Sequence, residues 1–236
     1  MVVYENLNKI IKIKDSILTV GTFDGLHKGH STIFNEMDSL ANDDRIKVAL
    51  SFNPHPKKVL NTKQEFELLI SKEKKIELFK KSNIDILVLI PFDLKFSKMI
   101  ALDFLKNIII DFFNPSIILV GHDHRFGYKR KGDFKFLQSY ENDCNYKTVK
   151  VNPYSLDEEV VSSTLIRNYI KNYKLDLANK MLGWNYEISG KVIKGNGIGK
   201  KMNFPTANIK VDYKKICLPS VGVYAIRVKI DGNKYK

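Results

Sequence analysis

Short apolar runs alternate with amphipathic helical patterns along the first half of the chain, and this alternation restricts the fold more than any other feature. Each run is rich in Ile, Leu and Val, and each helical pattern repeats apolar residues every three or four positions. Near-continuous apolar strands joined by helices indicate a parallel sheet that is covered on both faces. The sequence therefore predicts an α/β fold with a doubly wound parallel sheet. Strands are expected at 16–20, 46–52, 84–92 and 116–121, and helices at 30–41, 71–82 and 97–113.

The pattern changes near residue 184. The following residues alternate apolar and polar side chains between Gly-containing turns, with no long helical pattern. We therefore expect one domain at 1–183 and a small β domain at 184–236. Residues 225–236 are typical of a hairpin with Asp231-Gly232 as its tight turn, and few residues follow that turn. A short return strand leaves edge groups unpaired, so we expect the β domain to be incomplete in this chain.

Composition limits the class of protein. No apolar run is long enough to span a bilayer, and the first residues lack the pattern of a signal peptide. The two cysteines, Cys144 and Cys217, lie far apart in the sequence without partners at metal-ligand spacing. We expect a reduced, cytoplasmic protein with no zinc site and no membrane partner.

The formal net charge of +13 would suit a nucleic-acid surface. However, only five of the 39 basic residues are arginines, and the lysines are spread along the chain among many Asn and Ile residues. That distribution is also typical of the coding bias of an AT-rich genome. We therefore expect no nucleic-acid partner, whereas the positive charge remains suitable for attracting polyphosphate ligands.

All five histidines directly follow predicted strands. They occupy the three segments 21–30, 53–56 and 121–127, as His27, His30, His55, His122 and His124. The carboxyl ends of parallel strands meet at one edge of a sheet, and ligands of such sheets bind there. The sequence therefore predicts one shared site at this edge.

The segment GTFDGLHKGH (21–30) places two of these histidines around Gly29, at a junction between loop and helix. The start of a helix presents unpaired N–H groups and a partial positive charge, which suits a phosphate. Gly29 would let a phosphate approach the backbone closely. His27 and His30 would add donors that can follow the charge that builds on phosphoryl oxygens. A metal site is disfavoured because no Cys or Glu stands at a ligand spacing.

A second helix start carries three consecutive hydroxyls. In VSSTLIRNYI (161–170), Ser162, Ser163 and Thr164 precede an apolar-periodic helix that contains Arg167. A helix cap explains one such hydroxyl but not three with an arginine one turn later. Together these groups could bind a polyphosphate.

The motifs GTFDGLHKGH, FNPHP, GHDHRFG and VSSTLIR, in this order and spacing, resemble the bacterial bifunctional riboflavin kinase/FAD synthetase family. That family's N-terminal module belongs to the HxGH nucleotidylyltransferase superfamily, whose fold is Rossmann-like. The second region, with GKVIKGNGIGKKMNFPTANI, resembles the start of the riboflavin kinase module, a small β-barrel. The resemblance implies transfer of AMP from ATP to FMN, which gives FAD and pyrophosphate. A complete member would also phosphorylate riboflavin.

The resemblance also implies roles for individual residues. The catalytic residues would be His27, His30 and Arg167. ATP would be bound by Gly21, Phe23, Asp24, Gly29, Ser162, Ser163 and Thr164. The FMN side would be formed by Asn53, His55, Asp123 and Arg125. Mg²⁺ would bridge the phosphates largely through water. In the kinase module, Thr206 and Asn208 of the PTAN motif (Pro205–Asn208) would bind Mg–ATP, with Thr206 as metal ligand.

The chain departs from the family at several positions. His124 stands where the family has phenylalanine, which bears on the flavin pocket. Ile198 and Asn203 replace the usual Arg and Gly of the kinase loop, and Asn tolerates the positive φ that Gly would supply. The family segment with the kinase's catalytic Glu would lie beyond Lys236, so we expect little riboflavin phosphorylation by these residues alone.

Two other interpretations stay open. The acceptor could be another phosphate monoester, such as phosphopantetheine or nicotinate mononucleotide, since HxGH by itself indicates only nucleotidylyl transfer. The basic chain could instead be an RNA-binding, synthetase-like module, which would show aromatic residues among basic ones on an exposed strand. FNPHP and PTAN favour a flavin, and no such strand is evident.

Overall fold

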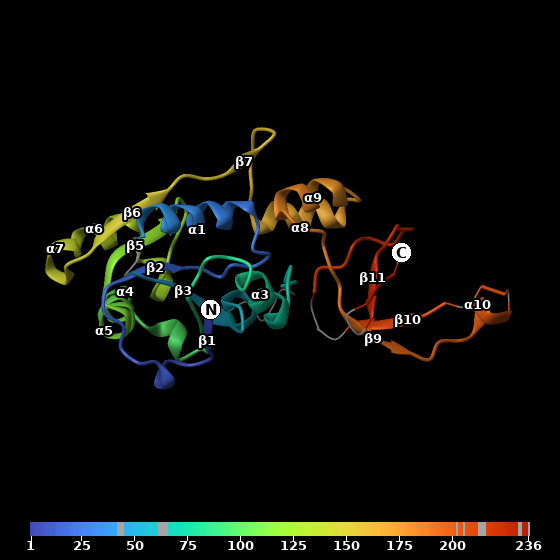
Figure 1. Ribbon diagram of the computed structural model, residues 1–236, viewed down its shortest axis with the longest axis horizontal. Coiled ribbons are helices and arrows are strands. Elements are labelled where there is room, and N and C mark those ends of the chain that lie inside the picture. Colours follow the sequence, from blue (N-terminus) through green and yellow to red (C-terminus); the bar gives the residue numbers. More distant parts are fainter. Residues whose placement is uncertain are drawn as a thin grey trace.

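A computed structural model describes residues 1–41, 45–60, 66–201, 203–204, 206–211, 216–230 and 233–235 (Figure 1). Its main feature is a six-stranded sheet in which every neighbouring pair of strands is parallel. The strand order is β1-β4-β3-β2-β5-β6. The strands are β1 (Val2–Tyr4), β2 (Ser16–Val20), β3 (Ile46–Asn53), β4 (Ile86–Pro91), β5 (Pro115–Gly121) and β6 (Lys147–Val151).

The four predicted strands are confirmed as β2, β3, β4 and β5, whereas β1 and β6 were not predicted. Both lie at the edges of the sheet. β1 has only three residues, and β6 (KTVKV) contains Lys147 and Lys150. Neither strand therefore shows a continuous apolar run. From β2 the chain builds outward to β3 and β4, and later returns to the other side of β2 with β5 and β6. The strand order therefore reverses between β2 and β5, where ligands of such sheets bind.

Two apolar layers cover the sheet, as predicted for a doubly wound fold. One layer packs β2 and β3 residues such as Ile17 and Ala49 against α1 (Lys28–Leu40), α3 (Lys72–Phe79), α8 (Ser163–Lys171) and α9 (Leu175–Leu182). The other packs Leu18 and Val48 against α4 (Ala101–Phe104), a π-helical segment (Leu105–Ile110), α5 (Asp111–Phe113) and α6 (Phe134–Ser139). Figure 1 shows the α4–α5 helix and α1 on opposite sides of the sheet. Successive β2 side chains thus point to opposite layers, as a pleated strand requires.

The helix predicted from residue 97 begins later than expected. A separate 3-10 turn spans Phe96–Lys98, and Met99 has an extended backbone. The Met99 carbonyl accepts a hydrogen bond from Tyr128 N–H at 2.7 Å. Met99 is therefore held by the loop after β5, and the helix starts at Ala101. Short elements complete this part: a 3-10 turn at Leu7–Lys9, α2 (Pro56–Leu60), a 3-10 turn at Tyr128–Arg130, α7 (Glu141–Cys144), β7 (Ser155–Leu156) and β8 (Glu159–Val160).

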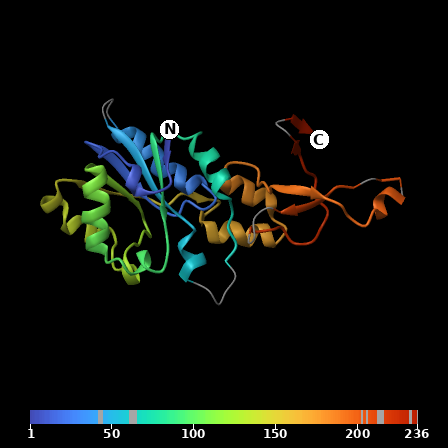
Figure 2. The same cartoon turned by 90° about the horizontal axis from the view of Figure 1, so that it is seen from below.

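The second region extends away from the sheet beyond α9 (Figure 2). Gly183, with φ of 78°, ends α9 in a left-handed conformation that favours glycine. Beyond it, β9 (Gly190–Ile193) pairs with β10 (Asn208–Val211), and β11 (Val228–Ile230) with β12 (Asn233–Tyr235); α10 is Ile198–Lys201. The predicted hairpin is confirmed, since Ile230 pairs with Asn233. Its turn residues, 231 and 232, and Pro205 of the PTAN motif lie outside the described residues.

Asn203 has a φ of 61°, which matches its expected replacement of a glycine in the kinase loop. Across the part of the chain that the structure describes, we find no helix with both the length and the apolar character needed to cross a membrane.

Candidate active site

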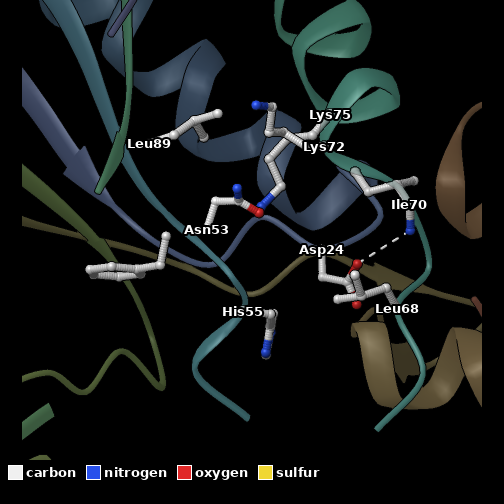
Figure 3. Close-up of a pocket in the computed structure, with 9 residues that line it drawn as sticks. Asp24, Asn53, His55, Leu68, Ile70, Lys72, Lys75 and Leu89 are labelled. Atoms are coloured by element: carbon white, nitrogen blue, oxygen red, sulfur yellow. Dashed lines mark hydrogen bonds between the residues drawn. The ribbon is translucent and has the colours of Figure 1, made fainter. Parts of the chain in front are cut away.

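A cavity of about 690 Å³ opens at the carboxyl ends of β2, β3 and β5. All five histidines line it, so the structure brings them together at this edge of the sheet. The other predicted site residues that line it are Gly21, Phe23, Gly29, Asp123, Arg125, Ser162, Ser163, Thr164 and Arg167. Asp24 and Asn53 instead line a small neighbouring cavity of about 20 Å³ (Figure 3). Thr206 and Asn208 belong to the second region and line neither cavity.

His27 and His30 lie against each other at the start of α1. His27 is the residue before the helix, and its carbonyl accepts the N–H of His30 at 2.8 Å. Their rings are stacked, with centroids 3.7 Å apart and planes 18° from parallel. Within the described residues, Nδ1 of each ring is buried without a hydrogen-bond partner. Two adjacent imidazoles of the cavity wall therefore have unused hydrogen-bonding capacity.

Burial keeps both rings neutral. It lowers the pKa of His27 to about 4, with a further contribution from the positive charge of Arg167. The pKa of His30 is also well below its ordinary value, because of burial first and the neighbouring His27 second. A phosphate that brings negative charge would oppose both effects and strengthen hydrogen bonds from these rings.

Two glycines of the motif are needed for close packing. A Cβ added at Gly29 would lie 3.1 Å from Nδ1 of His27 and 3.4 Å from the Val161 carbonyl oxygen. A Cβ at Gly21 would lie 2.9 Å from the ring of Phe23. Phe23 is buried and touches the edge of His30, with ring centroids 5.2 Å apart. Phe23 thus supports His30 from the core.

The Asp24 side chain makes its contacts outside its own loop. Its buried carboxylate accepts hydrogen bonds from the backbone N–H groups of Leu69, at 3.0 Å, and Ile70, at 3.4 Å. It also forms an ion pair with Arg167 of α8. Burial raises the pKa of Asp24, while the charges of Arg167 and Lys75 oppose that rise. A carboxylate that is 1% exposed needs these donors, and only distant segments supply them.

Arg167 is held on several sides. Its Nε donates to the Glu67 carbonyl at 2.7 Å, and its Nη1 donates to the Ser163 carbonyl at 3.0 Å. The guanidinium also lies over the ring of Phe66, 4.5 Å from the centroid. Arg167 therefore reaches the cavity wall with its orientation already fixed.

The three hydroxyls at the start of α8 have different surroundings. Ser162 is the helix cap and accepts the N–H of Leu165 at 3.2 Å. Ser163 donates to the Asp24 carbonyl at 2.8 Å, which ties α8 to the loop after β2. Thr164 is exposed. The ordinary capping role thus explains Ser162 alone.

The predicted flavin side divides into a buried and an exposed part. His55 is buried, stacks on Phe66 with centroids 4.5 Å apart, and accepts the N–H of Lys57 on Nδ1 at 3.1 Å. Burial, followed by the charge of Lys75, lowers the pKa of His55 to about 3. Asn53 is exposed at the end of β3.

Asp123 and Arg125 are exposed in the loop after β5, and Arg125 forms an ion pair with Asp133. Between them, His124 lies parallel to Phe126 with centroids 5.7 Å apart. Burial lowers the pKa of His124 to about 4. His124 thus presents a neutral, flat ring that stacks on Phe126.

Sequence reasoning missed Lys75 and Trp184. Lys75 is a buried lysine of α3 whose Nζ donates to the Thr22 carbonyl at 2.7 Å and to Ser51 Oγ at 3.1 Å. The signal was its spacing, since it lies four residues before the buried Phe79 on the same helix face. Trp184 Nε1 donates to the Gly25 carbonyl at 3.1 Å. No local pattern indicates that contact, because the two residues are far apart in the chain.

Removal of the buried carboxylate should be costly. Asp24→Ala leaves the Arg167 guanidinium without its anionic partner, and we expect a loss of about 3–5 kcal/mol in the free energy of unfolding. Arg125→Ala breaks an exposed ion pair and should change stability much less. Urea unfolding monitored by circular dichroism measures both. Equal effects of the two substitutions would contradict a structural role for the Asp24–Arg167 pair.

Neutral buried imidazoles should make stability depend on pH. The pKa of His124 is lowered to about 4, so below pH 6.5 the unfolded chain binds a proton that the folded chain does not. The free energy of unfolding therefore falls as the pH drops from 6.5 towards 4. Between pH 7 and pH 5, we expect the free energy of unfolding to fall by roughly 1–2 kcal/mol less in His124→Phe than in the wild type. Urea unfolding at the two pH values tests this, and equal losses in both proteins would contradict it.

Comparisons with known proteins agree with the geometry. A family model described as FAD synthetase matches residues 10–165, and one described as riboflavin kinase matches residues 182–236. A bifunctional riboflavin kinase/FMN adenylyltransferase from Buchnera aphidicola subsp. Schizaphis graminum is 36% identical over 231 residues, which cover 97% of this chain and 73% of that protein. The protein of the same name from Haemophilus influenzae is 31% identical over 226 residues, or 95% of this chain and 72% of that protein.

A solved structure from Streptococcus pneumoniae, titled a macrolide-efflux protein, superposes with a TM-score of 0.88 at 29% identity and covers 99% of this chain and 76% of that one. Its title describes that protein only. The similarity extends over both regions of the chain. The FAD synthetase model matches the first region and the riboflavin kinase model matches the second. The chain belongs to the bifunctional riboflavin kinase/FMN adenylyltransferase family.

Proposed function

We propose that this chain transfers AMP from ATP to FMN, giving FAD and releasing pyrophosphate. The observation that carries the proposal is the stacked pair of neutral imidazoles, His27 and His30, at the start of α1 in the wall of the cavity. Family membership supplies the identity of the two substrates, because the relatives are named for FMN adenylylation. The comparisons give no support to another acceptor or to an RNA ligand.

The chemistry needs no protein nucleophile. The phosphate of FMN has a second pKa of about 6, so it is largely a dianion at neutral pH and can attack the α-phosphate of ATP itself. The new bond joins an FMN phosphate oxygen to the α-phosphorus, and the bond from that phosphorus to the pyrophosphate oxygen breaks. Neither cysteine lines the cavity within the described residues. The protein's task is to align the two phosphates and to stabilise the charge that develops.

The start of α1 provides the first phosphate site. We assign backbone N–H groups of this helix start, with His27 and His30, to the α-phosphate and the leaving pyrophosphate. The close packing of Gly21, Phe23 and Gly29 would hold these groups in place before ATP binds. His30 would carry the larger share of transition-state stabilisation.

The start of α8 provides the second phosphate site. We assign the β- and γ-phosphates to Ser162, Ser163 and Thr164, of which Thr164 is exposed and Ser163 is tied to the Asp24 carbonyl. Arg167 would contribute its positive charge at the cavity wall, and Asp24 would keep its guanidinium oriented. We assign Asn53, His55, Asp123 and Arg125 to FMN.

Mg²⁺ fits this site as a companion of ATP. The described residues contain no group of three or more His, Cys, Asp or Glu side chains that could hold a metal ion. Mg²⁺ keeps several waters and binds mainly through substrate phosphates, so such a group is not required. When bound, it would neutralise part of the phosphate charge.

We further propose that residues 1–183 form the adenylyltransferase unit and residues 184–236 part of a riboflavin kinase unit, in the cytoplasm. The matches of the two family models support this division. In the second unit, Thr206 and Asn208 would bind Mg–ATP, with the Thr206 hydroxyl as a metal ligand. Thr206 Oγ1 lies 3.0 Å from the position that a Cβ on Gly199 would take, so α10 approaches it closely.

The reaction can be tested directly. The purified chain, incubated with ATP, Mg²⁺ and FMN, should give FAD and pyrophosphate in equal amounts, measured by liquid chromatography and a coupled pyrophosphate assay. Parallel incubations with phosphopantetheine or nicotinate mononucleotide in place of FMN test the other acceptors. A folded sample that makes no FAD above background would exclude the proposed function.

His30 should matter more for rate than for ATP binding. His30→Ala removes a donor that acts on developing charge, and we expect a fall in kcat of roughly 10²–10³-fold with ATP binding still measurable by calorimetry. Ser31→Ala, an exposed neighbour on α1, is the matched control and should keep wild-type rates. An unchanged kcat in the His30 variant would remove His30 from the mechanism.

A further inference from the structure

We propose that Lys75 is a positioning residue for adenylyl transfer: its buried ammonium fixes the loop after β2 against the end of β3 and places a positive charge behind the phosphate site. This inference rests on the proposed function. No sequence motif includes Lys75, and its role follows from its contacts alone.

The burial of Lys75 requires a reason. The residue is 8% exposed, although ammonium groups are strongly hydrated and their transfer out of water is costly. Its neighbours on α3, Lys72 and Lys74, form ion pairs at the surface with Glu5 and Glu187. Lys75 instead points inward from the same helix, at a position that an apolar residue could fill at less cost.

The ammonium connects two strand ends. Nζ donates to the Thr22 carbonyl at 2.7 Å and to Ser51 Oγ at 3.1 Å, and Ser51 Oγ itself donates to the Thr22 carbonyl at 3.2 Å. Thr22 directly precedes Phe23, which touches the ring of His30. The position of His30 therefore depends on a loop whose start is held by Lys75.

Lys75 also reaches the second, smaller cavity. That cavity of about 20 Å³ has room for about one water, and it is lined by Asp24 from the loop after β2, by Asn53 and His55 after β3, and by Lys75 (Figure 3). His55 lines the large cavity as well. The small cavity is thus next to the large one, and His55 separates them.

The charges that surround Lys75 leave the charge of its ammonium uncancelled. Asp24 and Arg167 form an ion pair whose charges cancel, so a protonated Lys75 leaves one net positive charge in the group. The other titratable groups that face it are His30 and His55, both neutral, and Lys72 on its own helix, which is paired with Glu5. Burial lowers the pKa of Lys75 to about 8, with Asp24 opposing the change. The positive charge is therefore present at neutral pH and lost as the pH rises through about 8.

Both proposed substrates carry negatively charged phosphates, so loss of this charge should weaken their binding and slow the reaction. We expect kcat/KM for FMN, with ATP and Mg²⁺ at fixed concentrations, to fall above about pH 8 in the wild type. Lys75→Arg keeps a charge that does not titrate in this range, so its alkaline fall should move at least one pH unit higher. Lys75→Met should lower kcat/KM about tenfold or more at pH 7 and lose the alkaline fall.

Lys81→Met is the matched control, because it removes one positive charge from an exposed position just after α3. It should keep both the wild-type rate and the wild-type pH profile. The inference is wrong if Lys75→Met matches Lys81→Met at pH 7, or if the fall near pH 8 is absent in the wild type or unchanged in Lys75→Arg. If Lys75→Met does not fold, the wild-type and Lys75→Arg profiles decide.

Calorimetric titration with Mg–ATP provides a readout that does not need turnover. Lys75→Met should weaken binding about fivefold or more at pH 7, whereas Lys81→Met should not. If the wild type makes no FAD, the proposed function fails and this titration still tests Lys75. If the wild type makes FAD and the Lys75 variants behave like Lys81→Met, only the role of Lys75 is refuted.

Discussion

The ion pair between Asp24 and Arg167 is the interaction on which the site depends. The carboxylate comes from the loop after β2, the guanidinium from α8, and the backbone donors of Leu69 and Ile70 from the segment before α3. All three segments contribute to the wall of the large cavity, the last of them through Phe66, although they are far apart in the sequence. A buried charge is costly unless it is paired, so the pair can form only when all three segments take their final places.

The segment 66–70 has a second role on its other side. The Leu68 carbonyl accepts the N–H of Cys217 at 2.8 Å, and the Cys217 carbonyl accepts the hydroxyl of Tyr186 at 2.6 Å. Cys217 is fully buried in the same apolar layer as α8 and α9. Part of the second region is therefore anchored to the segment that also holds Asp24 and Arg167. The two regions thus contact each other at this segment, in addition to being joined in sequence.

Burial determines which groups of the site carry a charge. Five histidines gather in one cavity, and burial lowers the pKa of four of them, His27, His30, His55 and His124. The net positive charge comes instead from Lys75 and the starts of two helices, because Asp24 balances the charge of Arg167. Neutral rings and fixed charges suit a reaction between two anions, because they reduce the repulsion between the anions and do not require the histidines to be protonated.

The alternation of apolar runs and helical patterns was sufficient to predict the doubly wound sheet, because strand and helix periodicity are local properties. HKGH likewise indicated the edge of the sheet where the cavity lies, since it follows a parallel strand, whereas SSTLIR follows the short antiparallel pair β7–β8. The two edge strands were not predicted, because β1 is short and β6 is interrupted by lysines. Only the tertiary structure decided that Asp24 binds Arg167, that Lys75 is buried beneath Thr22, and that four histidines are neutral. Those facts depend on which distant residues come into contact and how far they are buried from water. The spacing of residues along the chain determines neither.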